Sequence, residues 1–240
     1  MNWKACFSLC LCVGLAVQAW ATEPFIIKHI GTKQPLVFLT FDDGPRPGIT
    51  PKLNDILQDY DAKASFFFVA SQIELYPNLA KEVYRDGHTV GNHSYSHVHL
   101  EQKNEQFIIK DIAKSQVVFY NNLGFLPSLF RSPYGKYELT DTYKSHFKYM
   151  IHWTIDPRDW DETQSERDII KHILKHLKPG AIILLHENKK TVKLLPKLLK
   201  KLKKKGYRCL SLDAAIRGSN LPNPKVMQFW GDFQKSYTDL

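Results

Sequence analysis

Cysteine is scarce in this chain of 240 residues. Three of its four cysteines, Cys6, Cys10 and Cys12, lie near the N-terminus, and Cys209 is the only one further along. A chain without the three N-terminal cysteines can form no internal disulfide, so its fold must be stabilised by the core alone. Cys209 itself lies in an apolar, strand-like run over residues 207–212, which predicts a buried and unreactive thiol.

Beyond residue 21 the sequence has no long apolar run, no low-complexity linker and no internal repeat. These absences argue against a membrane-spanning helix in the mature chain and against a second domain. The hydrophobic content of 43% and the charged content of 24% are ordinary for a globular protein. The composition therefore favours one large domain with a substantial core.

The first 21 residues have a composition of their own. Lys4 gives a short basic start, the stretch over residues 5–19 is almost all apolar, and Ala19 and Ala21 flank Trp20 in a small-x-small pattern. This pattern predicts a signal peptide over residues 1–21, with cleavage after Ala21, and hence a periplasmic or secreted protein. The alternative is an uncleaved anchor, although the run is shorter than the roughly 20 residues that a spanning helix needs.

The chain is basic, with a formal charge of +9 that becomes +8 without Lys4. Such a charge is weak evidence for a polyanionic partner. The most basic stretch, residues 189–205, alternates lysines with leucines at helical spacing, which predicts a helix with an apolar core face and a solvated lysine face. The other interpretation is attraction to an anionic polymer such as a cell wall or a membrane surface. No motif indicates binding of nucleic acid.

Strand-like apolar runs alternate with helix-like stretches, which is typical of a parallel α/β fold. Predicted strands lie at 37–40, 65–69, 89–91, 129–131, 149–154, 181–185 and 207–210. Predicted helices lie at 50–60, 77–85, 105–121, 165–178 and 191–205. Thr50 is expected to cap the first helix, with Pro51 in its first turn.

Charged residues follow the predicted strands one after another. Asp42 and Asp43 follow the first strand, His93 the third, Arg131 the fourth and His186 the sixth. In a parallel barrel-like fold these strand ends share one face, where active sites form. Two adjacent carboxylates are costly unless a metal ion or a shared proton compensates them. The placement therefore predicts an active site at this face.

The spacing of two histidines indicates a metal site. His93 and His97 are four residues apart, so in a helix their imidazoles would lie on one face and could bind one cation with a carboxylate. Zinc suits these ligands best, and cobalt, nickel, manganese and iron are alternatives. His172 and His176 have the same spacing but lie in a charged helix away from any strand end, which predicts a solvated face.

Five short motifs occur in order between residues 35 and 212. They are Thr-Phe-Asp-Asp-Gly-Pro at 40–45, His-Ser-Tyr-Ser-His at 93–97, Arg-Ser-Pro-Tyr-Gly at 131–135, Asp-Pro-Arg-Asp-Trp at 156–160 and Leu-Leu-His-Glu at 184–187. With these motifs the chain resembles the polysaccharide deacetylase family, also called carbohydrate esterase family 4, with its NodB-type homology domain. The resemblance implies an α/β fold, a distorted (β/α) barrel, as a single catalytic domain over residues 35–215. An N-terminal extension at 22–34 and a tail at 216–240 would flank it.

The resemblance also implies the roles of individual residues. Asp42 would be the general base, and Asp43, His93 and His97 would bind the metal. His186 would be the general acid. The residues alone leave open which aspartate binds the metal, and the order of the family motif makes this assignment.

Further roles concern the surroundings of these groups. The backbone N–H of Tyr134 would stabilise the oxyanion, and Asp159, held by Arg131, would orient His186 and keep it charged. The residues assigned to substrate binding are Pro133, Trp160 and Leu184. Glu187 stands where the family usually has aspartate, at a position without an assigned chemical role.

The implied reaction is removal of acetyl groups from amino sugars. We expect peptidoglycan to be the substrate, because the leader and the basic surface suit an anionic envelope polymer. Chitin oligosaccharides, another exopolysaccharide and O-acetyl esters of xylan are alternatives within the same chemistry. A glycan-binding protein without catalysis is the alternative from another class, and the intact set of acidic and histidine residues argues against it.

Overall fold

A curved parallel sheet forms the centre of the fold. The computed structural model describes residues 25–136 and 141–218. In this part of the chain the strand order is β1-β6-β5-β4-β3-β2-β7, with β8 paired beside the start of β2. The strands are β1 (Phe25–Ile27), β2 (Leu36–Gly44), β3 (Ser65–Phe68), β4 (Thr89–Asn92), β5 (Leu129–Phe130), β6 (Tyr149–Ile151), β7 (Ala181–His186) and β8 (Arg208–Cys209).

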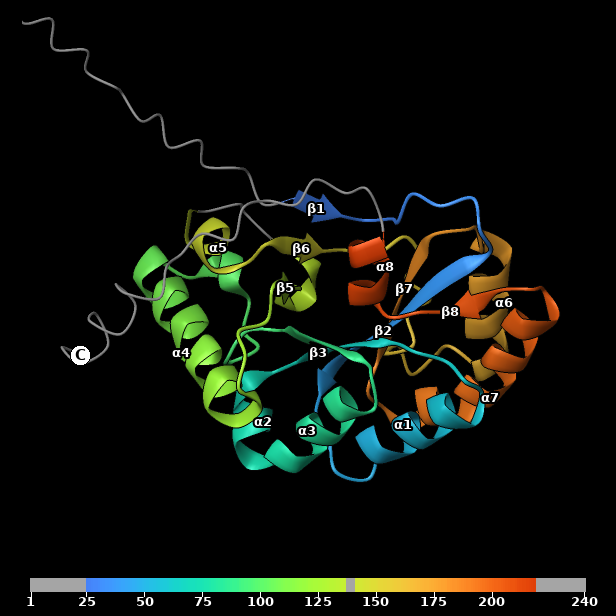
Figure 1. The fold of residues 1–240 in the computed structure, drawn as a ribbon, viewed down its shortest axis with the longest axis horizontal. Helices are drawn as coiled ribbons and strands as arrows, with labels where there is room; N and C mark the ends of the chain where they lie inside the picture. Colours follow the sequence, from blue (N-terminus) through green and yellow to red (C-terminus); the bar gives the residue numbers. More distant parts are fainter. Residues whose placement is uncertain (1–24, 137–140, 219–240) are drawn as a thin grey trace, which may run out of the picture.

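Helices surround most of this sheet. They are α1 (Thr50–Asp59), α2 (Ala70–Leu75), α3 (Pro77–Arg85), α4 (Glu105–Leu123), α5 (Asp141–His146), α6 (Glu166–His176), α7 (Lys189–Lys204) and α8 (Leu212–Gly218). Figure 1 shows α4, α2, α3, α1, α7 and α6 as an arc around the strands, with β1 and β6 on the remaining side. The sheet is thus a half-barrel, which confirms the predicted distorted (β/α) barrel. Among the described residues, no helix has both the length and the apolar character needed to cross a membrane.

All the predicted strands and helices are present, with small shifts at their ends. The sequence patterns missed β1, whose three residues are too few to show a period. This strand pairs with β6, so part of the predicted N-terminal extension belongs to the sheet. The patterns also missed the short helices α2, α5 and α8, the last of which crosses the predicted boundary at residue 215. The predicted signal peptide lies outside the described residues.

One detail of α1 differs from the prediction. Thr50 is the first helical residue, and Ile49 stands at the N-cap without a side-chain hydrogen bond. The Thr50 hydroxyl instead donates to the buried carboxyl group of Glu187. The predicted capping by Thr50 is therefore wrong, because its hydroxyl binds a residue distant in sequence. Pro51 lies in the first turn, as predicted.

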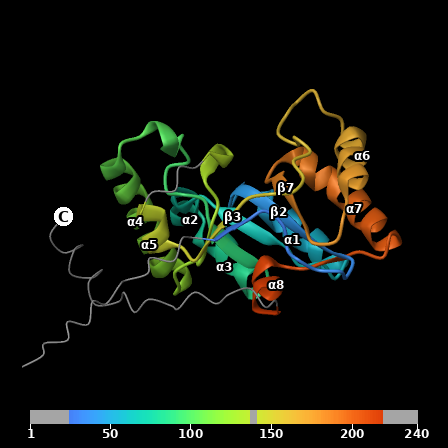
Figure 2. The same ribbon diagram turned by 90° about the horizontal axis from the view of Figure 1, so that it is seen from above.

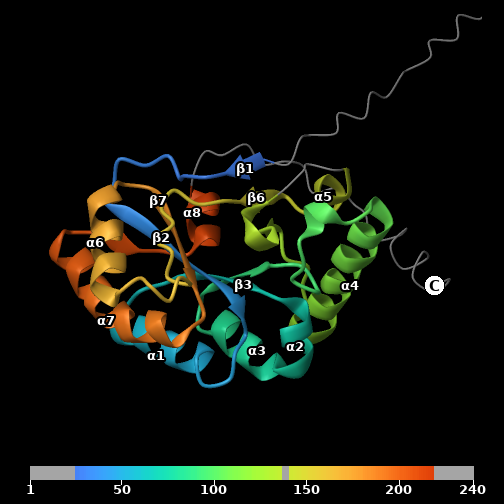
Figure 3. The same cartoon turned by 180° about the vertical axis from the view of Figure 1, so that it is seen from behind.

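The two faces of β2 show how the sheet separates core from site. Val37, Leu39 and Phe41 pack in one apolar cluster with residues of α1, α6 and α7. Phe38 packs in a second cluster that also contains residues of β1, β5, β6 and α8. Because side chains alternate along a strand, Thr40 and Asp42 lie on the same face as Phe38. Figure 2 shows β2, β3 and β7 between α4 and α5 on one side and α6 and α7 on the other, and Figure 3 shows α8 near β1 and β6.

Three smaller predictions are confirmed. Leucines of α7 form its buried face, and its lysines are on the outside. Cys209 is buried, and burial raises the pKa of its thiol to about 12, so it stays protonated. His172 and His176 are exposed on α6.

Candidate active site and metal centre

A β-bulge at the end of β2 places the two adjacent aspartates. Asp42 pairs with Phe67 of β3, and Gly44 pairs with the next residue, Phe68, so Asp43 is an extra residue in β2. Its backbone has a φ of 76°, in the left-handed region. In a regular strand Asp43 would point to the face opposite Asp42. The bulge re-aims it, so that both carboxylates reach the same rim of the barrel.

His93 and His97 are brought together by a loop, not by the helix that their spacing suggested. The loop follows β4, and two of its residues, Ser94 with a φ of 66° and His97 with a φ of 53°, are left-handed. The Ser94 hydroxyl accepts a hydrogen bond from the backbone N–H of His97 at 3.0 Å. Asp111 of α4 accepts hydrogen bonds from two further backbone N–H groups of the loop. This folding holds the two imidazole rings 4.9 Å apart.

Asp43, His93 and His97 form a compact set of metal-ligating groups. Asp43 Oδ1 lies 3.0 Å from His97 Nε2 and 3.6 Å from His93 Nε2. One ligand atom from each residue lies within 4.8 Å of the other two. Burial raises the pKa of Asp43, but hydrogen bonds and charge from the two imidazoles outweigh it and hold this pKa well below its usual value. Asp43 is therefore an anion in this site.

The tautomer of His93 fits metal binding. Its Nδ1 lies 2.7 Å from the backbone carbonyl oxygen of Arg131, which can only accept a hydrogen bond. When the ring is neutral, Nδ1 must then carry the proton, so that the lone pair of Nε2 is available to a cation shared with Asp43. A second hydrogen bond of this kind is the usual support of a metal-binding histidine. Two imidazoles and a carboxylate, arranged in this way, fit a divalent cation such as zinc.

Asp42 is held by Arg131 inside the barrel. Asp42 is 3% exposed and Arg131 1%. Arg131 Nη1 donates to Asp42 Oδ1 at 2.7 Å and to Thr40 Oγ1 at 2.8 Å. The prediction that Arg131 holds Asp159 was therefore wrong. The reason is that Arg131, directly after β5, extends its guanidinium group toward the inner face of β2. A buried arginine requires an anionic partner, and Asp42 is the carboxylate within reach.

His186 is paired with Asp159. Its Nδ1 lies 2.7 Å from Asp159 Oδ1, and its backbone N–H donates to Asp159 Oδ2 at 2.8 Å. The hydroxyl of Thr191 and the amide of Asn188 also donate to Asp159. Burial lowers the pKa of His186, but the hydrogen bond and charge of Asp159, with Asp42 and Asp43, raise it to about 9. The ring is therefore an imidazolium at neutral pH.

Adjacent strands place this imidazolium beside the carboxylates. In the parallel pairing of β2 and β7, Asp42 lies opposite His186 and Thr40 lies opposite Leu184. Leu184 is buried, one layer below His186 on the same face of β7. The rim thus carries a carboxylate and an imidazolium next to the three metal-ligating groups.

The other predicted site residues surround this rim. Trp160 is 51% exposed and lines one groove together with Asp43 and His186. Tyr134 has a φ of 59°, and its ring lies 5.0 Å from that of His97, in the loop that follows β4. Pro133, the residue before Tyr134, is buried.

Sequence reasoning missed several supporting residues. Thr40, which accepts from Arg131, could have been found from its alternation with Asp42 along β2. Asn188 and Thr191 begin α7, and Asn188 caps this helix. No local pattern indicated that both would also bind Asp159. Glu187 has no place in the predicted chemistry, yet it is fully buried beside this rim.

Comparisons with known proteins agree with this geometry. The family model described as polysaccharide deacetylase matches residues 29–150. A peptidoglycan-N-acetylglucosamine deacetylase of Bacillus cereus is 32% identical, over 80% of this chain and 93% of the relative. A chitooligosaccharide deacetylase of Azorhizobium caulinodans is 33% identical, over 66% of this chain and 77% of the relative.

A solved structure extends the similarity to three dimensions. It is a peptidoglycan N-acetylglucosamine deacetylase in complex with an N-oxidanyl-benzamide, with a TM-score of 0.76 and 31% identity. The match covers 83% of this chain and 96% of the other. Fold, site geometry and sequence agree, and the chain belongs to the polysaccharide deacetylase family.

Proposed function

We propose that this protein is a metal-dependent hydrolase that removes N-acetyl groups from N-acetylglucosamine residues of a glycan, with peptidoglycan as its substrate. One observation carries the proposal. A carboxylate held by a buried arginine and an imidazolium held by a buried aspartate lie opposite each other on β2 and β7, beside a set of three metal-ligating side chains. Hydrolysis of an amide needs a base, an acid and a polarising group arranged in this way.

The metal would be held by Asp43, His93 and His97. We propose zinc, because two imidazoles and a carboxylate suit it, and cobalt, nickel, manganese or iron can replace it in such a set. A bound cation supplies a Lewis acid and lowers the pKa of a water molecule toward neutrality.

The protein side chains would move the protons. Asp42 would take a proton from the attacking water, and the hydrogen bond from Arg131 orients its carboxylate. The backbone N–H of Tyr134 would stabilise the negative oxygen that forms when water adds to the amide carbonyl, a contribution of a few kcal/mol. His186 donates its proton to the nitrogen as the carbon–nitrogen bond breaks. The products are acetate and a free amino sugar.

Trp160 and Leu184 would line the pocket for the acetyl methyl group, and Pro133 would contact the substrate beside it. Leu184 and Pro133 are buried and apolar, while Trp160 is half-exposed at the mouth of the groove. The protonated His186 favours an N-acetyl substrate over an O-acetyl ester, because an amine leaves only after it gains a proton. The name of the Azorhizobium relative supports chitin oligosaccharides as the second candidate substrate.

The proposal is tested by measuring two products. Acetate and new amine are quantified from peptidoglycan, chitin oligosaccharides and acetylated xylan, with and without a chelator and after metal is restored. We expect both products in equal amounts from the N-acetyl glycans, loss with chelator and recovery with zinc. Asp42→Asn and His186→Ala should each lower kcat by about 10²- to 10⁴-fold. A protein that binds these glycans but releases no acetate would be a binding protein instead.

We also propose that the protein is exported and acts in the periplasm or outside the cell. The support is the leader-like composition of residues 1–21. N-terminal sequencing of the protein from fractionated cells should find a chain that starts at Thr22 outside the cytoplasm. A full-length chain that stays in the cytoplasm would contradict this.

A further inference from the structure

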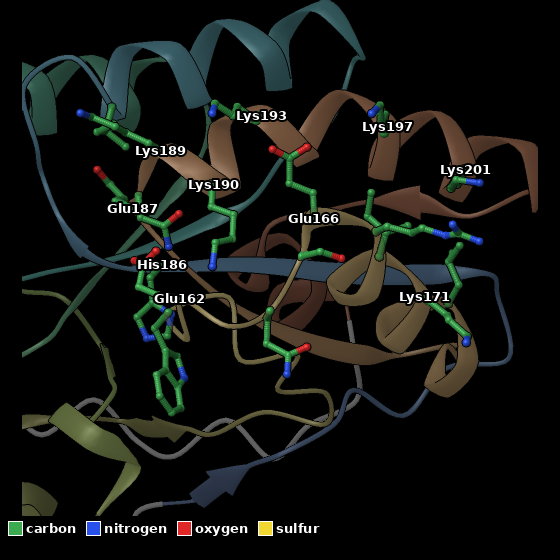
Figure 4. Close-up of a pocket in the computed structure, with 18 of the residues that line it drawn as sticks. Glu162, Glu166, Lys171, His186, Glu187, Lys189, Lys190, Lys193, Lys197 and Lys201 are labelled. Atoms are coloured by element: carbon green, nitrogen blue, oxygen red, sulfur yellow. The ribbon is translucent and has the colours of Figure 1, made fainter.

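A long groove extends from the active site between α6 and α7. It has a volume of 1570 Å³, and Asp43, Trp160 and His186 line it where it meets the rim of the barrel. Ile170 and Leu174 of α6 add apolar surface further along. A glycan strand with one sugar at the rim can therefore continue into this groove. Figure 4 shows His186 at one end of the groove and Lys201 toward the other.

The walls of the groove are strongly basic. Ten lysines and arginines line it, against four carboxylic acids. Five lysines recur at every fourth position of α7 and its C-cap, and we call them the α7 stripe: Lys189, Lys193, Lys197, Lys201 and Lys205. The α6 wall repeats the same spacing with Arg167, Lys171 and Lys175. At 1.5 Å per residue, the α7 stripe is about 24 Å long.

This arrangement is unfavourable for the helix itself. Like charges four residues apart destabilise a helix by about 0.2–0.5 kcal/mol per pair, and the α7 stripe contains such pairs along its whole length. In the described part of the chain, no lysine of the stripe forms an ion pair with a carboxylate. Two facing helices therefore direct an excess of positive charge into one groove that opens at the active site.

We propose that the groove between α6 and α7 binds a carboxylate-bearing stretch of the same glycan strand whose sugar is at the active site. The inference rests on the proposed function and narrows its substrate class to an anionic glycan, in preference to a neutral one such as a chitin oligosaccharide. Continuity of the groove with the rim identifies the occupant as the substrate strand. The two basic walls identify the charge of that strand.

The test compares one sugar backbone in two charge states. Acetate release is measured on soluble peptidoglycan strands with free carboxylates and on the same strands after their carboxylates have been amidated. At low salt we expect a KM about tenfold lower for the carboxylate form, which corresponds to about 1.4 kcal/mol. The difference should disappear near 1 M NaCl, where screening acts over about 3 Å.

Reversing the charge of two lysines tests whether the preference for the carboxylate form depends on the α7 stripe. The double variant Lys193→Glu, Lys197→Glu should raise the KM for the carboxylate form to at least that for the amidated form, so that the preference disappears. Its helix should remain intact, because each new glutamate lies four residues from a remaining lysine. The matched control is Lys200→Glu, Lys204→Glu, which makes the same charge change on exposed positions of α7 outside the groove. This control should keep the preference.

Binding is measured separately from turnover. The Kd of a labelled carboxylate strand should rise about tenfold in the groove variant and stay unchanged in the control. If the wild type releases no acetate from any strand, the proposed function fails, and this measurement still tests the groove. Equal effects of the two double variants, or equal KM for both forms of the strand, would overturn the proposal. So would binding to phosphatidylglycerol vesicles through the stripe without binding to the soluble strand.

Discussion

Removing the charge of Asp159 should move the alkaline limb of the pH–activity profile. In the wild type the pKa of His186 is raised from 6.5 to about 9, a difference equivalent to about 3 kcal/mol. Burial alone would lower this pKa, so the carboxylates near the ring contribute more than the net shift. Asp159 is the principal one, at 2.7 Å from Nδ1. Asp159→Asn keeps the shape of the side chain but removes its charge.

The sign of the change follows from the role of His186 as acid. Activity requires the protonated ring, so kcat falls as the pH rises through its pKa. In Asp159→Asn we expect the alkaline limb to move down by at least about two pH units. With a pKa of about 7, the variant should be about tenfold less active than the wild type at pH 8 and about 100-fold less active at pH 10, while the two should approach each other at lower pH.

The assay is acetate release with the metal-loaded enzyme between pH 5 and 10. Thr191→Val is the matched control, because it removes one hydrogen bond to Asp159 but leaves the carboxylate charge in place. Its alkaline limb should move by less than about half a unit. An unchanged limb in Asp159→Asn would refute the assignment of His186 as the acid. Equal loss of activity at every pH would show that Asp159 only supports the fold.

Three further predictions concern buried groups near the rim. Arg131→Met should lower the free energy of unfolding by about 3–5 kcal/mol in urea denaturation, because it leaves Asp42 buried without its partner. A loss under about 1 kcal/mol would contradict this. Gly44→Ala should cost about 1–3 kcal/mol, since the new methyl group would overlap the carboxyl group of buried Glu187, whereas Gly31→Ala meets no atom within 4 Å. Equal melting temperatures of the two alanine variants would refute the clash. Burial raises the pKa of Glu187 from 4.5 to about 8, so its contribution to stability is full below pH 4.5 and is lost as the pH rises to about 8. Glu187→Gln should therefore gain about 1–3 kcal/mol relative to the wild type between pH 5 and 8 in denaturation curves, and a constant difference would contradict this reasoning.

The order of strands and helices, and the identity of the residues at the strand ends, could be predicted from local patterns in the amino-acid sequence. Apolar runs such as that before Asp42 are long enough to define a strand, and the residue after each run must then lie at the rim. Parallel strands with crossover helices bring those ends to one face, so Asp42, His93, Arg131 and His186 could be assigned to one site. Composition also distinguished His93 and His97 from the exposed pair on α6.

The orientation of these side chains and the pairs that they form depend on tertiary contacts that no local pattern predicts. The β-bulge at Asp43 and the left-handed backbone of Ser94 and His97 each involve single residues. Such features do not change the hydrophobic periodicity of the sequence and cannot be predicted from it. Arg131 binds a partner 89 positions away, and nothing local distinguishes Asp42 from Asp159 as that partner. The facing of the two basic helix walls likewise depends on how α6 and α7 pack. Local sequence patterns report the helix or strand propensity of a segment and the alternation of its buried and exposed side chains. The contacts named above instead form between segments that are distant in sequence and that the curved sheet brings together.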